Sequence, residues 1–174
     1  MHENIFLIGF MGTGKSTVSR QLGRQLKLLE IDMDQEIEAR QGRKISEIFE
    51  MEGEEYFRSL ETGLIRELAQ KSGYIISCGG GAALRTENVE SMKKNGIVVL
   101  LLAEPETVYE RVRCRKNRPL LNGNMNVGYI TELMKKRETA YRSAADISVI
   151  TDHRTPEDIA AEIVSYVNKL KVSV

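Results

Sequence analysis

The stretch Gly9-Phe10-Met11-Gly12-Thr13-Gly14-Lys15-Ser16 decides how this chain folds. It matches the pattern G-x-x-x-x-G-K-[ST] in full, and it lies between the apolar run 5–8 and a helical pattern with apolar residues at 18, 22 and 26. In that context the glycines let the backbone curl, so that its N–H groups converge on phosphate oxygens at the positive end of the following helix. The stretch therefore predicts a strand, a phosphate-binding loop and a helix, and it indicates nucleotide binding.

Two side chains of this loop have predicted roles of their own. Lys15 reaches the β- and γ-phosphates, and the Ser16 hydroxyl is a ligand for Mg²⁺. The loop residues expected to hold the nucleotide are Gly12, Thr13, Gly14, Lys15, Ser16 and Thr17. An ordinary glycine turn before a helix is the simpler alternative, but motif and context are both present here. The pattern does not say which molecule accepts the phosphate.

Short apolar runs alternate with helical patterns along the rest of the chain. The runs occupy 5–8, 28–31, 74–77, 97–102 and 147–150. Runs so short and so continuously apolar are typical of strands buried on both faces of a parallel sheet. The intervals 54–72 and 128–143 carry apolar residues at helical spacing, and Thr155-Pro156 marks another helix start. The alternation predicts an α/β three-layer sandwich with a five-stranded parallel sheet, forming one domain over residues 1–174.

The composition excludes several functional classes. The 174 residues include 25 basic and 25 acidic side chains, which excludes a uniformly basic binder of nucleic acid or anionic membrane. The longest apolar run, 97–103, is too short to cross a bilayer, and the N-terminus lacks the basic segment of a signal peptide. Cys78, Cys114 and two distant histidines offer no zinc site and fit a reducing compartment. We therefore expect a cytoplasmic protein with no membrane and no nucleic-acid partner.

A cluster of basic residues leaves one alternative of another class. Five basic side chains within eight positions could follow a phosphate backbone, namely Arg111, Arg113, Arg115, Lys116 and Arg118. No aromatic residue interleaves them, so base stacking lacks a platform. The cluster also leads into 116–126, where turn-forming residues predict a loop of the length typical of a functional lid.

Acidic and glycine-rich segments follow the second and third apolar runs. Asp32 and Asp34 lie where strand ends line the ligand crevice, so one could support a metal ion and the other orient or deprotonate an acceptor hydroxyl. Acids at a helix N-terminus are also common without any such role. Gly79-Gly80-Gly81 exposes consecutive N–H groups, which suits an anion or a closely packed ligand. Arg137 falls on the apolar stripe of 128–143, so it must find an anion, either a protein carboxylate or a ligand.

Taken together, these segments resemble the shikimate kinases, a family of P-loop kinases within the nucleoside-monophosphate-kinase-like group. The resemblance runs over nearly the whole chain and rests on motifs in a fixed order. They are 9–16, Asp32-Met33-Asp34, Phe57-Arg58-Ser59-Leu60-Glu61, Gly79-Gly80-Gly81, Arg118-Pro119-Leu120-Leu121, and Arg137 with Tyr141-Arg142. The phosphate loop is generic, whereas the other motifs together are specific to the family. The resemblance implies a P-loop kinase fold with a mobile lid at about 112–126 and an acceptor-binding helical region at about 33–61.

The resemblance also implies an activity and a set of site residues. The activity is phosphorylation of the 3-hydroxyl of shikimate by ATP with Mg²⁺, giving shikimate 3-phosphate and ADP on the way to aromatic amino acids. The implied catalytic residues are Lys15, Asp34 and Arg118, and the implied acceptor residues are Asp34, Phe49, Phe57, Arg58, Gly79, Gly80, Gly81 and Arg137. Glu61 is implied to orient Arg58. The remaining nucleotide residues are Arg111, Arg118, Arg154 and Pro156, and the metal residues are Ser16 and Asp32, the latter through water. A monomer is expected.

Several alternatives stay open at this point. A gluconate kinase or a nucleoside monophosphate kinase shares the loop and the lid. Arg58 and Glu61 are one helical turn apart and could be a surface ion pair worth about 0.2–0.5 kcal/mol. Phe49 and Phe57 could simply be core residues. Whether Asp34 removes a proton or only aligns the acceptor hydroxyl is also open.

Overall fold

A five-stranded parallel sheet forms the centre of the molecule, in the strand order β2-β3-β1-β4-β5. The structure is a computed structural model, and it describes residues 3–113 and 126–172. The strands are β1 (Asn4–Ile8), β2 (Leu29–Asp32), β3 (Tyr74–Ser77), β4 (Gly96–Leu102) and β5 (Ile147–Ile150). Each begins and ends within one residue of its predicted bounds, so the sequence prediction of the sheet is confirmed.

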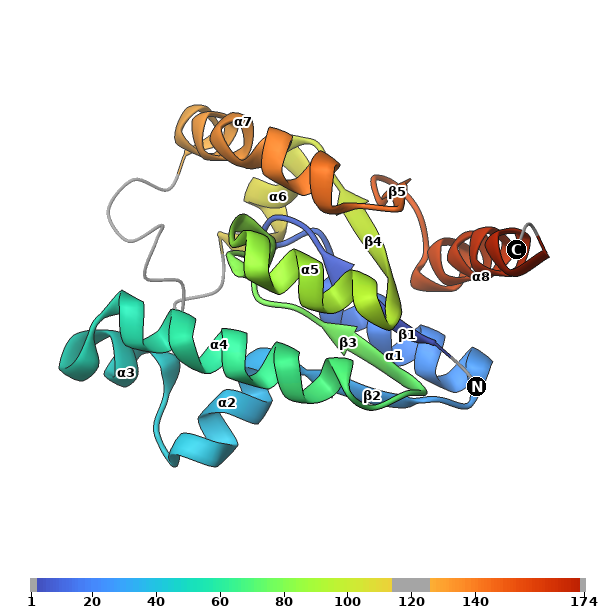
Figure 1. The fold of residues 1–174 in the computed structure, drawn as a ribbon. Coiled ribbons are helices and arrows are strands. Elements are labelled where there is room, and N and C mark those ends of the chain that lie inside the picture. Colours follow the sequence, from blue (N-terminus) through green and yellow to red (C-terminus); the bar gives the residue numbers. More distant parts are fainter. Residues whose placement is uncertain (1–2, 114–125, 173–174) are drawn as a thin grey trace.

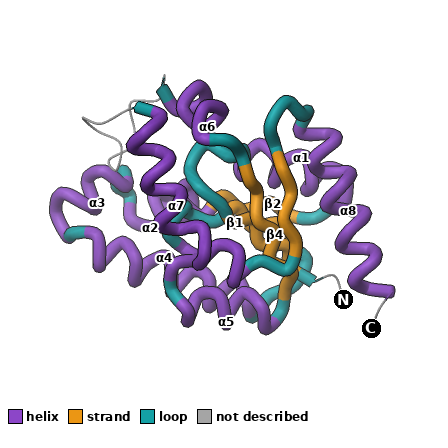
Figure 2. Tube along the Cα trace, turned by 90° about the horizontal axis from the view of Figure 1, so that it is seen from above, coloured by secondary structure: helices purple, strands orange, loops and turns teal. Residues whose placement is uncertain are grey.

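Helices follow every strand and cover both faces of the sheet (Figure 1). They are α1 (Lys15–Leu26), α2 (Met33–Gln41), α3 (Ile45–Glu52), α4 (Glu54–Ala69), the short 3₁₀ helix η1 (Ala82–Leu84), α5 (Thr86–Lys94), α6 (Pro105–Val112), α7 (Val127–Ala144) and α8 (Pro156–Val172). Helices α1 and α8 pack on one face, and α4, α5 and α7 pack on the other, as the view from above shows (Figure 2). The predicted α/β three-layer sandwich is therefore confirmed, although α4 ends three residues earlier than 54–72 predicted.

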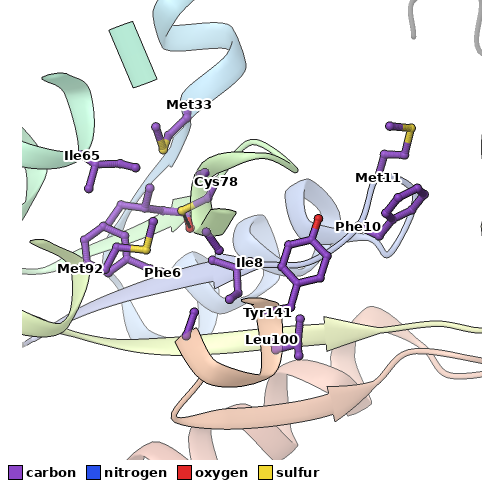
Figure 3. Close-up of a cluster of buried hydrophobic side chains, with 14 of the residues drawn as sticks. Phe6, Ile8, Phe10, Met11, Met33, Ile65, Cys78, Met92, Leu100 and Tyr141 are labelled. Atoms are coloured by element: carbon purple, nitrogen blue, oxygen red, sulfur yellow. Dashed lines mark hydrogen bonds between the residues drawn. The ribbon is translucent and has the colours of Figure 1, made fainter. Parts of the chain in front are cut away.

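The alternation of side chains along β1 explains the two outer layers. Ile5 and Leu7 pack into the core cluster under α1 and α8, whereas Phe6 and Ile8 pack into the cluster under α4, α5 and α7 (Figure 3). All five residues of β1 are buried, because both neighbouring strands and both helical layers cover them. The central strand therefore holds the phosphate loop, which follows Ile8, in a fixed place between the two layers.

The two edge strands do not fit the prediction that all five strands are buried on both faces. β1, β3 and β4 are buried along most of their length, but Leu29 in β2 and Ile150 in β5 are exposed. An edge strand has one neighbouring strand instead of two, so its side chains reach water more easily. The prediction was wrong at these positions because an apolar run does not reveal whether its strand lies at the centre or at the edge of a sheet.

The strand order places a crevice between the ends of β1 and β3. The chain leaves β1 toward β2 on one side of the sheet and leaves β3 toward β4 on the other, so the two connecting loops diverge. Ligands of open α/β sheets bind at such a point. Of the lid predicted at about 112–126, residues 114–125, which include Cys114 and Arg118, lie outside the described residues. Within the described ranges, no helix is both long and apolar enough to cross a membrane.

Candidate active site

The loop after β1 passes so close to its neighbours that two of its glycines leave no room for a side chain. Gly9 and Gly12 have φ angles of +140° and +78°. A Cβ atom at Gly9 would lie 2.5 Å from a carbonyl oxygen of β4, and one at Gly12 would lie 2.7 Å from a side chain of α6. The Lys15 ammonium donates to Gly9 O at 2.9 Å and to Phe10 O at 3.0 Å. The loop therefore holds its own lysine against its backbone.

Three side-chain oxygen atoms lie close together where α1 begins and where β2 and β3 end, namely those of Ser16, Asp32 and Ser77. Ser16 Oγ donates to Asp32 Oδ2 at 2.5 Å and lies 3.4 Å from Ser77 Oγ. The other oxygen of Asp32 caps α2 by accepting from the backbone N–H groups of Asp34 at 3.1 Å and Gln35 at 3.3 Å. Asp32 is thus both a helix cap and a partner of the loop serine. Hydroxyl and carboxylate oxygens are donors that Mg²⁺ prefers, with phosphate and water completing its shell, so this set fits that ion.

A cavity of about 560 Å³, which we call the loop cavity, lies beside the phosphate loop. Its lining includes Gly12, Thr13, Gly14, Lys15, Ser16, Thr17, Asp32, Asp34, Gly79, Gly80, Arg111, Arg154 and Pro156. Arg111 Nη1 donates to Gly12 O at 3.2 Å and to Thr151 Oγ1 at 3.1 Å, which ties α6 to the loop. Arg154 pairs with Glu162 at 2.5 Å. The residues predicted for the nucleotide thus share one cavity, except Arg118, which lies outside the described residues.

Arg58 in α4 donates hydrogen bonds to the carboxylates of Glu54 and Glu61. Its Nη1 donates to Glu61 Oε2 at 2.5 Å, while Nε and Nη2 both donate to Glu54 Oε1, at 3.2 and 2.9 Å. The side chain of Glu61 is 1% exposed and that of Arg58 is 12% exposed. Their contact is therefore a buried ion pair, and the alternative of a weak surface pair is wrong. Burial raises the pKa of Glu61, and the neighbouring guanidinium only partly offsets this effect.

Gly79 and Gly81 lie against charged side chains of other elements. A Cβ atom at Gly79 would overlap Glu61 Oε1 and lie 3.3 Å from Asp34 Oδ1. A Cβ atom at Gly81 would overlap the Arg58 guanidinium, with Cζ only 2.6 Å away. The two glycines are therefore needed here to admit side chains from α2 and α4.

Gly80 lies next to both α7 and the phosphate loop. A Cβ atom here would lie 3.9 Å from Arg137 Nη1 and 3.8 Å from the Met11 backbone nitrogen. Tyr141 donates its hydroxyl to Gly80 O at 2.5 Å, and the Arg137 guanidinium lies 5.7 Å from the centre of the Phe10 ring. Burial raises the pKa of Tyr141. Helix α7 thus holds the glycine backbone and places Arg137 in the same neighbourhood.

A second hollow of about 410 Å³, which we call the arginine hollow, lies on the α4 side of the glycine triplet. It is lined by Glu54, Glu55, Arg58, Gly81, Leu84, Arg85 and Arg137. Gly79 and Gly80 line the loop cavity, and Gly81 lines the arginine hollow. The triplet therefore separates a phosphate-binding surface from a hollow with three arginines, and Asp34 lies on the loop-cavity side beside Gly79. This arrangement can bind two anions close together and place a carboxylate between them.

Comparison with known proteins points to one family. The family model described as shikimate kinase matches residues 11–168. A shikimate kinase of Burkholderia lata is 46% identical over 150 residues, which cover 86% of this chain and 82% of the relative. The chain belongs to the shikimate kinase family. The resemblance stated from its motifs is thereby confirmed.

Solved structures separate this family from its more distant neighbours. A shikimate kinase from Acinetobacter baumannii in complex with shikimate has a TM-score of 0.93 and 37% identity, covering 98% of this chain and 96% of that chain. A gluconokinase from Sinorhizobium meliloti has a TM-score of 0.60 and 14% identity, covering 97% and 93%. The second likeness shows a shared fold alone, whereas the family members also share the sequence.

Two residues predicted to contact the acceptor are packed with the core. Phe57 is buried, and the centre of its ring lies 5.0 Å from that of Phe49, which packs against the same cluster. The Arg58 guanidinium lies 5.3 Å from the centre of the Phe57 ring, so this ring also supports the arginine. Cys78 belongs to the same core cluster, and burial raises the pKa of its thiol (Figure 3). Its place before the glycine triplet is that of a small core residue.

Four residues at the site were missed by sequence reasoning. They are Glu54, Ser77, Arg85 and Thr151. Glu54 stands four residues before Arg58, and this spacing on a helix was a usable signal for an ion pair. The other three have no local signal, because their partners lie far away in the sequence and only the fold brings them together.

Proposed function

We propose that this protein transfers the γ-phosphoryl group of ATP to the 3-hydroxyl of shikimate, giving shikimate 3-phosphate and ADP. The observation that carries the proposal is the convergence of Arg58 and Arg137 on the glycine triplet, which also borders the phosphate loop. Shikimate has one carboxylate and three hydroxyls on a small ring. Two arginines match the carboxylate, and Asp34 matches the hydroxyls. The relative solved with shikimate supports this choice of acceptor.

On the nucleotide side, the proposed work is positioning and charge neutralisation, which dominate phosphoryl transfer. The loop N–H groups bind the phosphates, and Lys15 turns from its two loop carbonyls to phosphate oxygens. Arg111, Arg154 and Pro156 line the loop cavity and are proposed to flank the base. Mg²⁺ bound with ATP supplies further neutralisation, and Ser16 with Asp32, the latter through water, are proposed to hold it.

On the acceptor side, side chains orient the substrate. Arg58 and Arg137 bind the carboxylate, Glu61 holds Arg58, and Asp34 accepts a hydrogen bond from the hydroxyl that attacks the phosphorus. A monomer is proposed as the working unit, as the resemblance of the motifs implies. The unpaired, buried Cys78 thiol supports a cytoplasmic setting.

A panel of acceptors tests the proposal. ADP release is measured with ATP, Mg²⁺ and either shikimate, gluconate or AMP, each at several concentrations. We expect turnover with shikimate only. If shikimate releases no more ADP than buffer while gluconate or AMP is phosphorylated, the chain is a related small-molecule kinase and the proposal is wrong.

The role proposed for Asp34 has a separate test. Asp34→Asn keeps the shape of the side chain but removes its negative charge, so kcat with shikimate is expected to fall while ATP affinity stays nearly the same. Nucleotide affinity is measured by calorimetry and kcat by ADP release. Full kcat in this variant would contradict the role of Asp34 at the acceptor hydroxyl.

A further inference from the structure

Arg58 holds its two carboxylate partners in different ways. The bond from Nη1 to Glu61 is made to a side chain that is 1% exposed, beneath Gly79. The bonds from Nε and Nη2 both go to one oxygen of Glu54, whose side chain is 56% exposed. A buried carboxylate cannot leave its partner without losing its compensation, whereas an exposed one can turn into water at little cost. Arg58 therefore has one permanent partner and one that can exchange.

The edge that Glu54 holds is suited to a ligand carboxylate. A guanidinium accepts a carboxylate best along an edge that offers two parallel N–H donors, and Nε with Nη2 is such an edge. The rest of the Arg58 guanidinium is in contact with Glu61, Gly81 and the Phe57 ring. Glu54 and Arg58 line the arginine hollow together. An acceptor carboxylate that binds Arg58 along this edge must take the donors that Glu54 uses.

We propose that Glu54 is an exchangeable counter-ion of Arg58, which the carboxylate of the acceptor displaces, so that Glu54 lowers the affinity for the acceptor. The inference rests on the proposed function, because it concerns the carboxylate of shikimate. Two effects act in the same direction. Glu54 competes for the donors of Arg58, and its negative charge repels an anionic acceptor that enters the hollow.

The neighbouring residue offers a matched control. Glu55 lies in the same first turn of α4 and lines the same hollow, but it pairs with Arg85. Arg85 Nη2 donates to both carboxylate oxygens of Glu55, each at 2.6 Å. Its side chain is 83% exposed. Replacing either glutamate by glutamine removes one charge from the hollow and from the start of the helix. Only the Glu54 change also removes the negative charge that is paired with Arg58.

The experiment compares the wild-type chain, Glu54→Gln and Glu55→Gln in steady-state kinetics with shikimate and ATP. In Glu54→Gln we expect the KM for shikimate to fall about two- to fivefold, the range that an exposed ion pair allows. The change should lie in KM for shikimate and not in KM for ATP. Glu55→Gln is expected to give a clearly smaller change. Thermal unfolding of all three chains checks that they are equally folded.

A neutral acceptor separates the exchange from a general effect. The carboxamide of shikimate carries no charge, so Glu54→Gln is expected to leave its KM unchanged relative to the wild-type chain. Equal falls in KM for shikimate and its carboxamide would overturn the proposal, as would equal effects of the two glutamine variants. A rise in KM for shikimate in Glu54→Gln would show instead that Glu54 positions Arg58 for binding, which also overturns it.

The proposed phosphorylation of shikimate and the proposed exchange at Arg58 would be contradicted by different results. If the wild-type chain does not phosphorylate shikimate at all, the proposed function is wrong. If the wild-type chain phosphorylates shikimate but Glu54→Gln has the same KM, only the exchange at Arg58 is wrong. A third variant, Glu54→Ala, removes the remaining amide hydrogen bond to Arg58 and should lower the KM at least as far as Glu54→Gln.

Discussion

The loop cavity and the arginine hollow are built in different ways. Around the loop cavity, the groups proposed to bind phosphate come from one continuous stretch, 9–16, in which Gly9 and Gly12 leave no room for a side chain. Around the arginine hollow, the groups are side chains from α4, α7 and the segment after β3. A backbone cradle is fixed by the fold of a few consecutive residues, whereas a side-chain site depends on the packing of distant elements.

Because of this difference, we expect point mutations to affect the two cavities differently. Apart from replacement by proline, a point mutation leaves a backbone N–H donor in place, so the loop cavity has few side chains whose loss is decisive. The arginine hollow has several, and two of them are held by carboxylates: Arg58 by Glu61, and Arg85 by Glu55. We therefore expect mutations to affect nucleotide chemistry at one or two positions, and acceptor binding at many.

The largest effect is expected from Lys15→Ala. This change removes the one flexible cation of the loop that can follow the transferred phosphate, so kcat should fall by at least about 10²–10³-fold. ADP release with saturating shikimate measures the loss. Lys44→Ala, a surface lysine paired with Glu38, is the control and should keep its activity. A Lys15→Ala variant that retains a tenth of wild-type kcat would contradict the role of Lys15 at the transferred phosphate.

A smaller effect is expected from Arg137→Ala. Losing charged hydrogen bonds to the acceptor carboxylate should raise the KM for shikimate about 10- to 100-fold while leaving the KM for ATP close to its wild-type value. Arg142→Ala, on the same helix but exposed and paired with Glu138, serves as the control. An unchanged KM for shikimate would mean that Arg137 does not bind the carboxylate.

Gly81→Ala tests the boundary between the two cavities. The added Cβ overlaps the Arg58 guanidinium, so we expect a loss of about 1–3 kcal/mol in the free energy of unfolding together with weaker shikimate binding. Gly63→Ala in α4 is a matched control, because nothing lies within 4 Å of its added Cβ and alanine favours a helix, so its stability should rise slightly. Urea unfolding compares the two variants. Equal stability in both would show that Arg58 moves aside without cost.

The smallest effect is expected at an exposed ion pair outside both cavities. Hydrogen bonds from Arg40 and Lys71 lower the pKa of Glu67 to about 2. Because this value is below the unfolded-state pKa of about 4.3, the stabilisation is present above that pH and disappears as the pH falls toward 2. Glu67→Gln should therefore cost roughly 0.2–1 kcal/mol at pH 7 and less at pH 3, measured by urea unfolding. A larger loss at pH 3 than at pH 7 would contradict this sign.

Much of the sheet could be predicted because strand formation depends on local apolar pattern. The runs 74–77 and 147–150 have the same bounds as β3 and β5. Exposure could not be predicted in the same way, since Leu29 and Ile150 look like core residues in the sequence and are exposed at the edges of the sheet. The position of a strand in the sheet depends on the whole topology, which no short segment contains.

For the site, the sequence alone determined the phosphate loop and, through the order of its motifs, the family. Those features depend on consecutive residues, whose geometry is set by local backbone freedom. Only the tertiary structure decided that Arg58 and Glu61 form a buried ion pair and that their side chains fill the space beside Gly79 and Gly81. It also decided that Glu54 accepts hydrogen bonds from Nε and Nη2 of Arg58. Burial and exchange between partners depend on what packs around a residue, and that is settled when helices from distant parts of the chain come together.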